Sequence, residues 1–245
     1  MNTHAVQGNF LYRNLANATS ILGVLPLGIL FLGDGYKYVV PLIIFNNIMD
    51  DLDGILAAKL KIKSQFGADL DNVCDAVAHV ILALVVGAHF GGVVLAASAL
   101  AAGAILLRVV SRVSPGAATG TGSPTNELMR HMLFTLLLAG QFDLPAEYLL
   151  IPVFLLHSVS MLVPFAMSAL LRSRTKAATL VGIVNVALVA AWLLPPATPV
   201  IAAAFIGTYL YAFAAGAERY RKQRGGVIER QPDRAAPPPA PPGQE

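Results

Sequence analysis

Long apolar runs, separated by short polar turns, follow one another along the chain as far as residue 217. A helix needs about 20 apolar residues to cross a hydrocarbon core about 30 Å thick. The candidate spans are residues 19–32, 37–60, 67–90, 92–113, 126–142, 148–171, 177–194 and 199–217. This pattern predicts an all-α fold, a polytopic integral membrane helical bundle with about eight transmembrane helices.

Basic residues gather in alternate turns of the predicted bundle, and such residues favour the cytoplasmic side of a membrane. If Arg13 is cytoplasmic, the same side also receives Lys59, Lys61, Lys63, Arg108, Arg112, Arg130, Arg172, Arg174, Lys176, Arg219, Arg221, Lys222 and Arg224. Lys37 falls on the other side. We therefore expect both termini in the cytoplasm, a transmembrane domain at 1–224 and a disordered, proline-rich cytoplasmic tail at 225–245.

The composition agrees with a membrane protein. Of the 245 residues, 56% are hydrophobic and 13% are charged, and the mean hydropathy is +0.65, above the range that is usual for soluble domains. The formal net charge of +3 comes from basic residues beside the apolar runs. It therefore indicates membrane orientation and not a nucleic-acid surface. The single cysteine, Cys74, excludes an internal disulfide.

One segment, residues 50–75, departs from the apolar pattern because it contains six aspartates. Asp50 and Asp53 lie about 60° apart on one predicted helix, and Asp71 and Asp75 share a face of the next. Ionisable groups within a membrane cost about 2.5–3.5 kcal/mol each, so they face an interior and have a partner. Divalent cations bind carboxylate oxygens, so the four carboxylates predict a metal site near the cytoplasmic end of the bundle.

Two other interpretations accompany this one. A carboxylate cluster within a membrane is also typical of the cation site of a transporter. The remaining aspartates of the segment, Asp51 and Asp69, point about 100° or more away from the two acidic faces. We interpret them as solvated, or as supporting the metal ligands from outside the site.

The spacing of the acidic segment resembles the signature of the CDP-alcohol phosphotransferase family, D-x2-D-G-x2-A-R-x8-G-x3-D-x3-D. Its positions are matched by Asp50, Asp53, Gly54, Ala57, Gly67, Asp71 and Asp75. Such a register rarely arises by chance, so the resemblance outweighs the transporter interpretation. Ala58 stands where the family has an arginine, and Lys59 lies next to it, about 100° around the helix. A lysine there replaces the charge but not the forked guanidinium.

The resemblance implies a membrane enzyme that transfers the phosphatidyl group of CDP-diacylglycerol to a hydroxyl acceptor and releases CMP. In the family's scheme the aspartates bind divalent metal, Mg²⁺ or Mn²⁺, as two ions. The implied ligands are Asp50, Asp53, Asp71 and Asp75, and Asp75 is also the general base. The substrate-binding residues that the resemblance implies are Gly54, Ala57, Lys59, Gly67, Asn17 and Thr19.

The arginines expected near the site indicate which kind of hydroxyl acceptor the enzyme uses. Arg108, Arg112 and Arg130 are expected on the side of the aspartates, where an arginine binds an anionic acceptor such as a serine carboxylate or a phosphorylated polyol. The alternative is that Arg108 and Arg112 bind lipid phosphates as membrane anchors. Serine is our first choice. Inositol phosphate and choline remain alternatives, and so does a non-catalytic membrane protein that retains the metal site.

The expected partners are CDP-diacylglycerol, a small hydroxyl acceptor and membrane lipids. No nucleic acid is expected, and a homodimer is left open. The expected location is a bacterial inner (plasma) membrane, with the active site facing the cytoplasm.

Overall fold

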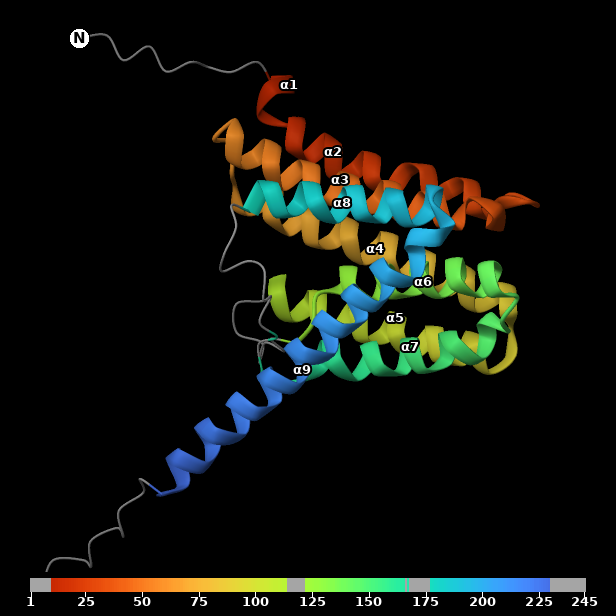
Figure 1. Ribbon diagram of the computed structural model, residues 1–245. Helices are drawn as coiled ribbons and strands as arrows, with labels where there is room; N and C mark the ends of the chain where they lie inside the picture. The colour runs from red at the N-terminus through yellow and green to blue at the C-terminus, as the bar shows by residue number, and fades with distance from the viewer. Residues whose placement is uncertain (1–9, 114–121, 166, 168–176, 230–245) are drawn as a thin grey trace, which may run out of the picture.

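The computed structural model describes residues 10–113, 122–165, 167 and 177–229. Within these residues every regular element is helical, and no strand is present. The α-helices are α1 (Phe10–Arg13), α2 (Leu15–Val24), α3 (Val39–Lys59), α4 (Gln65–Phe90), α5 (Gly92–Val113), α6 (Thr125–Phe142), α7 (Ala146–Leu162), α8 (Ala177–Leu193) and α9 (Thr198–Glu229). Short 3-10 helices are η1 (Leu25–Phe31), η2 (Gly35–Tyr38) and η3 (Pro195–Ala197). The predicted all-α fold is confirmed (Figure 1).

Each predicted span corresponds to a helix, and the fourth has the predicted bounds, 92–113. The first span begins earlier than predicted, at Leu15, and continues as the 3-10 helix η1 from Leu25. Pro26 lies in the first turn of η1, where it cannot donate an amide hydrogen to the preceding turn of an α-helix. The last helix continues to Glu229, beyond the predicted start of the tail at residue 225. Residues 230–245 of the predicted tail lie outside the described residues.

The sixth span is shorter than predicted, because α7 ends at Leu162 and not at residue 171. Val163 has an extended backbone, with φ −63° and ψ 145°. It precedes Pro164, and the ring of a proline keeps the preceding residue out of the helical region. The rest of that predicted span, 168–171, lies outside the described residues.

Helix α4 lies in the middle of the bundle and packs against α2, α3, α5 and α6. Figure 1 shows α2, α3 and α8 on one side of α4, and α5 and α7 on the other. Small side chains at the α4–α5 contact, including Ala83, Ala97 and Ala101, are fully or almost fully buried. Small residues allow helix backbones to approach closely within a membrane. Helix α4 also carries Asp71 and Asp75, so the predicted acidic site lies on the central helix of the bundle and its neighbours.

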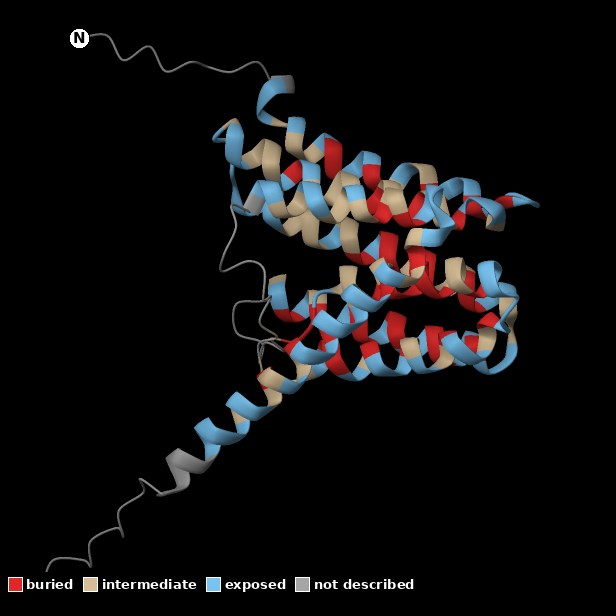
Figure 2. Cartoon of the chain, in the orientation of Figure 1, coloured by how far each residue is buried: buried red, intermediate tan, exposed pale blue. Residues whose placement is uncertain are grey.

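Several helices have the length and composition of membrane spans. Among the described residues, Gln65–Phe90, Gly92–Val113 and Pro195–Arg224 are long and apolar enough to cross a bilayer. Shorter apolar helices cover Leu15–Phe31, Ala146–Leu162 and Ala178–Leu193. Large apolar side chains such as Leu107, Val159 and Val186 are exposed on the outside of the bundle, as the pale blue faces of Figure 2 show. A helical membrane protein accounts for this exposure, because lipid covers such faces.

Candidate active site

A short turn brings the two acidic helices side by side. Lys61 has a left-handed backbone, with φ 56°, and reverses the chain after α3. Ser64 then caps α4, because its Oγ accepts a hydrogen bond of 3.0 Å from the backbone N–H of Gly67. A serine at this position satisfies one of the amide groups that a helix start leaves without a partner. The turn makes α3 and α4 antiparallel, so their acidic faces meet at one end of the bundle (Figure 1).

Three of the four predicted ligands converge. Asp50 and Asp53 of α3 and Asp71 of α4 each offer a carboxylate oxygen, and these oxygens all lie within 4.8 Å of one another. Asp75, one turn along α4 from Asp71, lies within hydrogen-bonding reach of Asp50. The two helix faces predicted from residue spacing are therefore brought together by the fold.

The residues present suit a divalent metal. Oδ1 of Asp71 is buried and has no hydrogen-bond partner among the described residues. Asp53 is 4% exposed and lies close to both Asp50 and Asp71. Carboxylates this close repel one another unless a cation or a proton lies between them. Oxygen-only ligand sets of this kind are typical of Mg²⁺ and Mn²⁺ sites.

Two neutral side chains from other helices donate to the aspartates of α3. The hydroxyl of Ser20, on α2, donates to Oδ2 of Asp53, and the amide of Asn126, on α6, donates to Oδ2 of Asp50. Each of these two hydrogen bonds is made to one carboxylate oxygen, Oδ2. From the sequence, Asn126 at the start of the fifth span is expected on the side of the aspartates but is not assigned to the site, and Ser20 is not singled out.

The polar residues predicted on the first span lie beside the site. The amide oxygen of Asn17 is 3.1 Å from the position that a Cβ on Gly67 would occupy, so Asn17 and Gly67 are neighbours across α2 and α4. The hydroxyl of Thr19 donates to the carbonyl of Leu15 in its own helix, at 3.0 Å. The side chain of this span that contacts an aspartate is Ser20, the next residue.

The other predicted residues of α3 border open space. A Cβ on Gly54 would meet no atom within 4 Å, and Gly54 is exposed next to the buried Asp53. Ala57 is half-buried, whereas Ala58 and Lys59 are exposed at the end of the helix. This arrangement leaves room beside the aspartates for a group of another molecule.

The three predicted arginines have different surroundings. Arg112 of α5 donates to Oδ1 of Asn72 at 3.2 Å. Asn72 follows Asp71 on α4, so the Arg112 guanidinium lies near Asp71. Arg130 of α6 lies 3.0 Å from Glu127 and donates to Oδ1 of Asn47 on α3, also at 3.0 Å. Both arginines thus border the acidic faces.

Arg108 is placed elsewhere. It is buried and donates to the backbone carbonyl of Met161 on α7, at 3.4 Å. This contact joins α5 to α7 and does not involve the aspartates. Its burial also differs from the alternative prediction of a lipid-phosphate anchor, which requires an accessible guanidinium.

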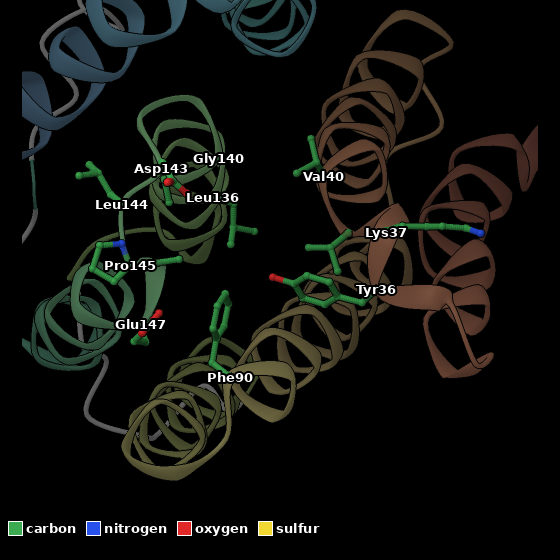
Figure 3. A pocket seen from close by; sticks show the side chains of 13 residues that line it. Tyr36, Lys37, Val40, Phe90, Leu136, Gly140, Asp143, Leu144, Pro145 and Glu147 are labelled. Carbon is green, nitrogen blue, oxygen red and sulfur yellow. The ribbon is translucent and has the colours of Figure 1, made fainter.

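A cavity of about 450 Å³ lies at the opposite end of the bundle. Tyr36, Val40, Phe90 and Leu136 line it, and the hydroxyl of Tyr36 points into it (Figure 3). Val40 is the second residue of α3 and lies ten residues before Asp50, which corresponds to about 15 Å along a helix. This cavity is therefore separate from the aspartates.

Comparison with known proteins connects this geometry to a family. A family model described as CDP-alcohol phosphatidyltransferase matches residues 13–218. Two relatives from Helicobacter pylori, strains J99 and 26695, are described as CDP-diacylglycerol–serine O-phosphatidyltransferase. They are 35% and 34% identical to this chain over 99 residues, which cover 37% of the chain and 40% of each relative. The similarity thus spans well under half of the relatives' length.

Proposed function

Because this chain belongs to the CDP-alcohol phosphatidyltransferase family, we propose that it transfers the phosphatidyl group of CDP-diacylglycerol to serine and releases CMP. The observation that supports this proposal is the convergence of Asp50, Asp53 and Asp71 from two neighbouring helices, with Asp75 in reach of Asp50. Phosphoryl transfer depends mainly on positioning and on neutralising charge at the phosphate oxygens. A cluster of carboxylates that holds divalent cations meets that need.

We assign Asp50, Asp53, Asp71 and Asp75 as ligands of two Mg²⁺ or Mn²⁺ ions. When bound, such ions neutralise the negative charge of the phosphate oxygens and orient the entering and leaving oxygens. Ser20 and Asn126 hold the aspartates of α3 in place by donating to one oxygen of each. The buried Oδ1 of Asp71, which has no hydrogen-bond partner among the described residues, would supply a further ligand atom to these ions.

Asp75 is the proposed general base. Its carboxylate accepts the proton of the acceptor hydroxyl while the hydroxyl oxygen forms a bond to the phosphorus that bears the diacylglycerol. The bond between this phosphorus and the bridging oxygen breaks, and CMP leaves with the electron pair. A carboxylate serves as a base in such a step when it lies within hydrogen-bond reach of the hydroxyl.

The nucleotide and the lipid phosphates occupy the open space beside Gly54, in this proposal. Gly54, Ala57 and Gly67 have small side chains where the substrate approaches the helices, and Asn17 lies next to Gly67. Lys59 provides a cation near this end of α3 in place of the family arginine. Its flexible chain gives a point charge without the two parallel donors of a guanidinium.

The acceptor lies on the α6 side of the aspartates in this proposal. Arg130, which borders Asn47, supplies a donor for the serine carboxylate, and Arg112, next to Asp71, supplies a cation for the phosphates. The names of the two relatives support serine over inositol phosphate or choline. We propose the cytoplasmic face of a bacterial inner membrane as the location, because Lys59, Lys61 and Lys63 lie at the end of α3 and in the turn to α4, at the same end of the bundle as the aspartates. Lys37, in η2, lies at the other end.

The experiment that tests the function measures CMP release. The purified protein is incubated with CDP-diacylglycerol, Mn²⁺ or Mg²⁺, and labelled serine, inositol phosphate, glycerol phosphate or choline in separate reactions. We expect serine-dependent release that Asp75→Asn abolishes. The matched control is Asp69→Asn. Asp69 lies on the same helix but accepts a hydrogen bond from Gln65, and we expect this variant to keep full activity.

Two other results would contradict parts of the proposal. Release that depends on another acceptor would reject serine and keep the reaction class. No release with any acceptor, from a folded protein that still binds Mn²⁺, would favour a non-catalytic protein that retains the metal site, for which Ala58 is the sequence argument.

A further inference from the structure

An amide from outside the acidic segment bonds to α3 beside the metal ligands. Asn185 lies in the middle of α8, a helix whose sequence is otherwise apolar apart from Thr179. Its Nδ2 donates to Oδ2 of Asp51 at 2.8 Å, and its Oδ1 accepts from Nδ2 of Asn47, also at 2.8 Å. Asn47 in turn donates to Asp51 at 3.1 Å. These three side chains form a closed network, here called the α3–α8 network.

The α3–α8 network continues to α6. Arg130 donates from Nε to the amide oxygen of Asn47 at 3.0 Å, and Asn126, one turn earlier on α6, donates to Asp50. Helix α3 is therefore hydrogen-bonded to both α8 and α6, and Asn47 bonds to each of them. Both sets of contacts lie within one turn of Asp50.

The network determines how α3 is rotated about its axis. Asp51 is the neighbour of Asp50 and points about 100° away from it, so a contact that orients Asp51 toward α8 orients Asp50 and Asp53 toward α4. Water is scarce between membrane helices, and polar groups there keep the partners that neighbouring helices supply. Without Asn185, α3 loses two of the bonds that oppose rotation.

We propose that Asn185 is a positioning residue for the metal-binding aspartates. Among the described residues its side chain bonds to Asp51, to Asn47 and to the carbonyl of Val181 in its own helix, so it acts on the metal-binding aspartates through Asp51 and Asn47. The inference rests on the proposed metal site, and it adds α8, which lies more than a hundred residues from the acidic segment, to the elements on which the site depends.

The test exchanges the two partners of one hydrogen bond. Asn185→Asp places a second carboxylate 2.8 Å from that of Asp51, so it should turn α3 away from α8. The double variant Asp51→Asn with Asn185→Asp moves the amide to α3 and the carboxylate to α8, which restores a donor and an acceptor. Each protein is reconstituted in nanodiscs, and its Mn²⁺ affinity is measured from the loss of the free Mn²⁺ signal in electron paramagnetic resonance.

We expect Asn185→Asp to weaken Mn²⁺ binding at least about tenfold, since hydrogen bonds to a charged group are lost and tenfold corresponds to about 1.4 kcal/mol. The double variant should recover affinity to within about threefold of wild type, as expected for coupled neighbours. Thr179→Ala, at the exposed start of α8, is the control and should bind as wild type does. If Asn185→Asp does not fold, Asn185→Ala replaces it with the same expected direction.

The inference is overturned if Asn185→Asp and Asn185→Ala bind Mn²⁺ like wild type, or if the double variant binds as weakly as Asn185→Asp. CMP release is measured in parallel. A wild-type protein that binds Mn²⁺ and releases no CMP contradicts the proposed reaction, and recovery of Mn²⁺ binding in the double variant would still support the positioning role.

Discussion

Ser20 of α2 and Asn126 of α6 donate hydrogen bonds to Asp53 and Asp50, the two aspartates of α3 that belong to the carboxylate cluster. Asp53 is almost fully buried, so the hydroxyl of Ser20 replaces a water molecule that would otherwise bond to the carboxylate. A hydrogen bond to a charged group contributes about 1.5–3 kcal/mol, and more is lost when a buried acceptor is left without a donor. The orientation of the Asp53 carboxylate within the cluster of Asp50, Asp53 and Asp71 therefore depends on one hydroxyl of a neighbouring helix.

Ser20→Ala removes this hydroxyl. We expect kcat/KM for CDP-diacylglycerol to fall about tenfold to a hundredfold, the factor that corresponds to about 1.5–3 kcal/mol. Ser20→Thr keeps a hydroxyl at the same position and should retain most of the activity. Initial rates of CMP release at several substrate concentrations measure the effect, and equal rates for Ser20→Ala and wild type would contradict the role given to Ser20.

At the scale of elements, α4 and α5 pack closely at the end of α4 that lies away from Asp71 and Asp75. The two helices are joined by Gly91 and Gly92, which have positive φ of 69° and 49°. A Cβ on Gly87 would lie 2.6 Å from Cβ of Ser98 and 3.2 Å from Cα of Leu95. Glycine at position 87 is thus what allows α5 to approach α4 at this end of the pair.

Gly87→Ala should separate the two helices there. We expect a loss of stability of about 1–3 kcal/mol, as for other overpacked positions, measured as a lower Tm in detergent. Gly103→Ala is the matched control, because a Cβ on Gly103 meets no atom within 4 Å. Alanine favours a helix over glycine by about 1 kcal/mol in both variants, so the difference between them reports the contact. Equal Tm values would contradict the close approach.

At the scale of the complete bundle, the aspartate cluster and the cavity beside Tyr36 lie at opposite ends. Figure 1 shows the start of α2 and the end of α9 at the end where α3 turns into α4. The turn that joins α6 to α7 lies at the other end, beside the cavity of Figure 3. The predicted cytoplasmic position of both termini is in keeping with this arrangement and stays a prediction.

Single cysteines test this orientation. In a Cys74→Ser background, Lys63→Cys lies in the turn between α3 and α4, and Leu144→Cys lies in the turn between α6 and α7; both positions are exposed. We expect a membrane-impermeant maleimide to label Leu144→Cys in intact cells and Lys63→Cys only after the membrane is permeabilised. Labelling of Lys63→Cys in intact cells would place the aspartates on the outer side and contradict the proposed topology.

Much of the site follows from local spacing. The periodicity of a helix is a property of a few consecutive residues, so the shared faces of Asp50 with Asp53 and of Asp71 with Asp75 are determined by the sequence itself. The apolar runs likewise determine the helices, because a backbone in lipid must satisfy its own hydrogen bonds. The sixth span was predicted to continue to residue 171, whereas α7 ends at Leu162. This end is also a local effect, because Pro164 keeps Val163 out of the helical region.

Other features were decided by the tertiary structure. Ser20 and Asn126 stand in short polar stretches at the start of apolar runs, and Asn185 stands within one. Nothing in their immediate sequence shows which helix each one contacts. The separation of Arg108 from Arg112, one turn apart on α5, depends on whether α4 or α7 faces each side chain. Helix neighbours and rotations result from side-chain packing over the whole bundle, so residues far apart in the sequence complete a site that local spacing only begins.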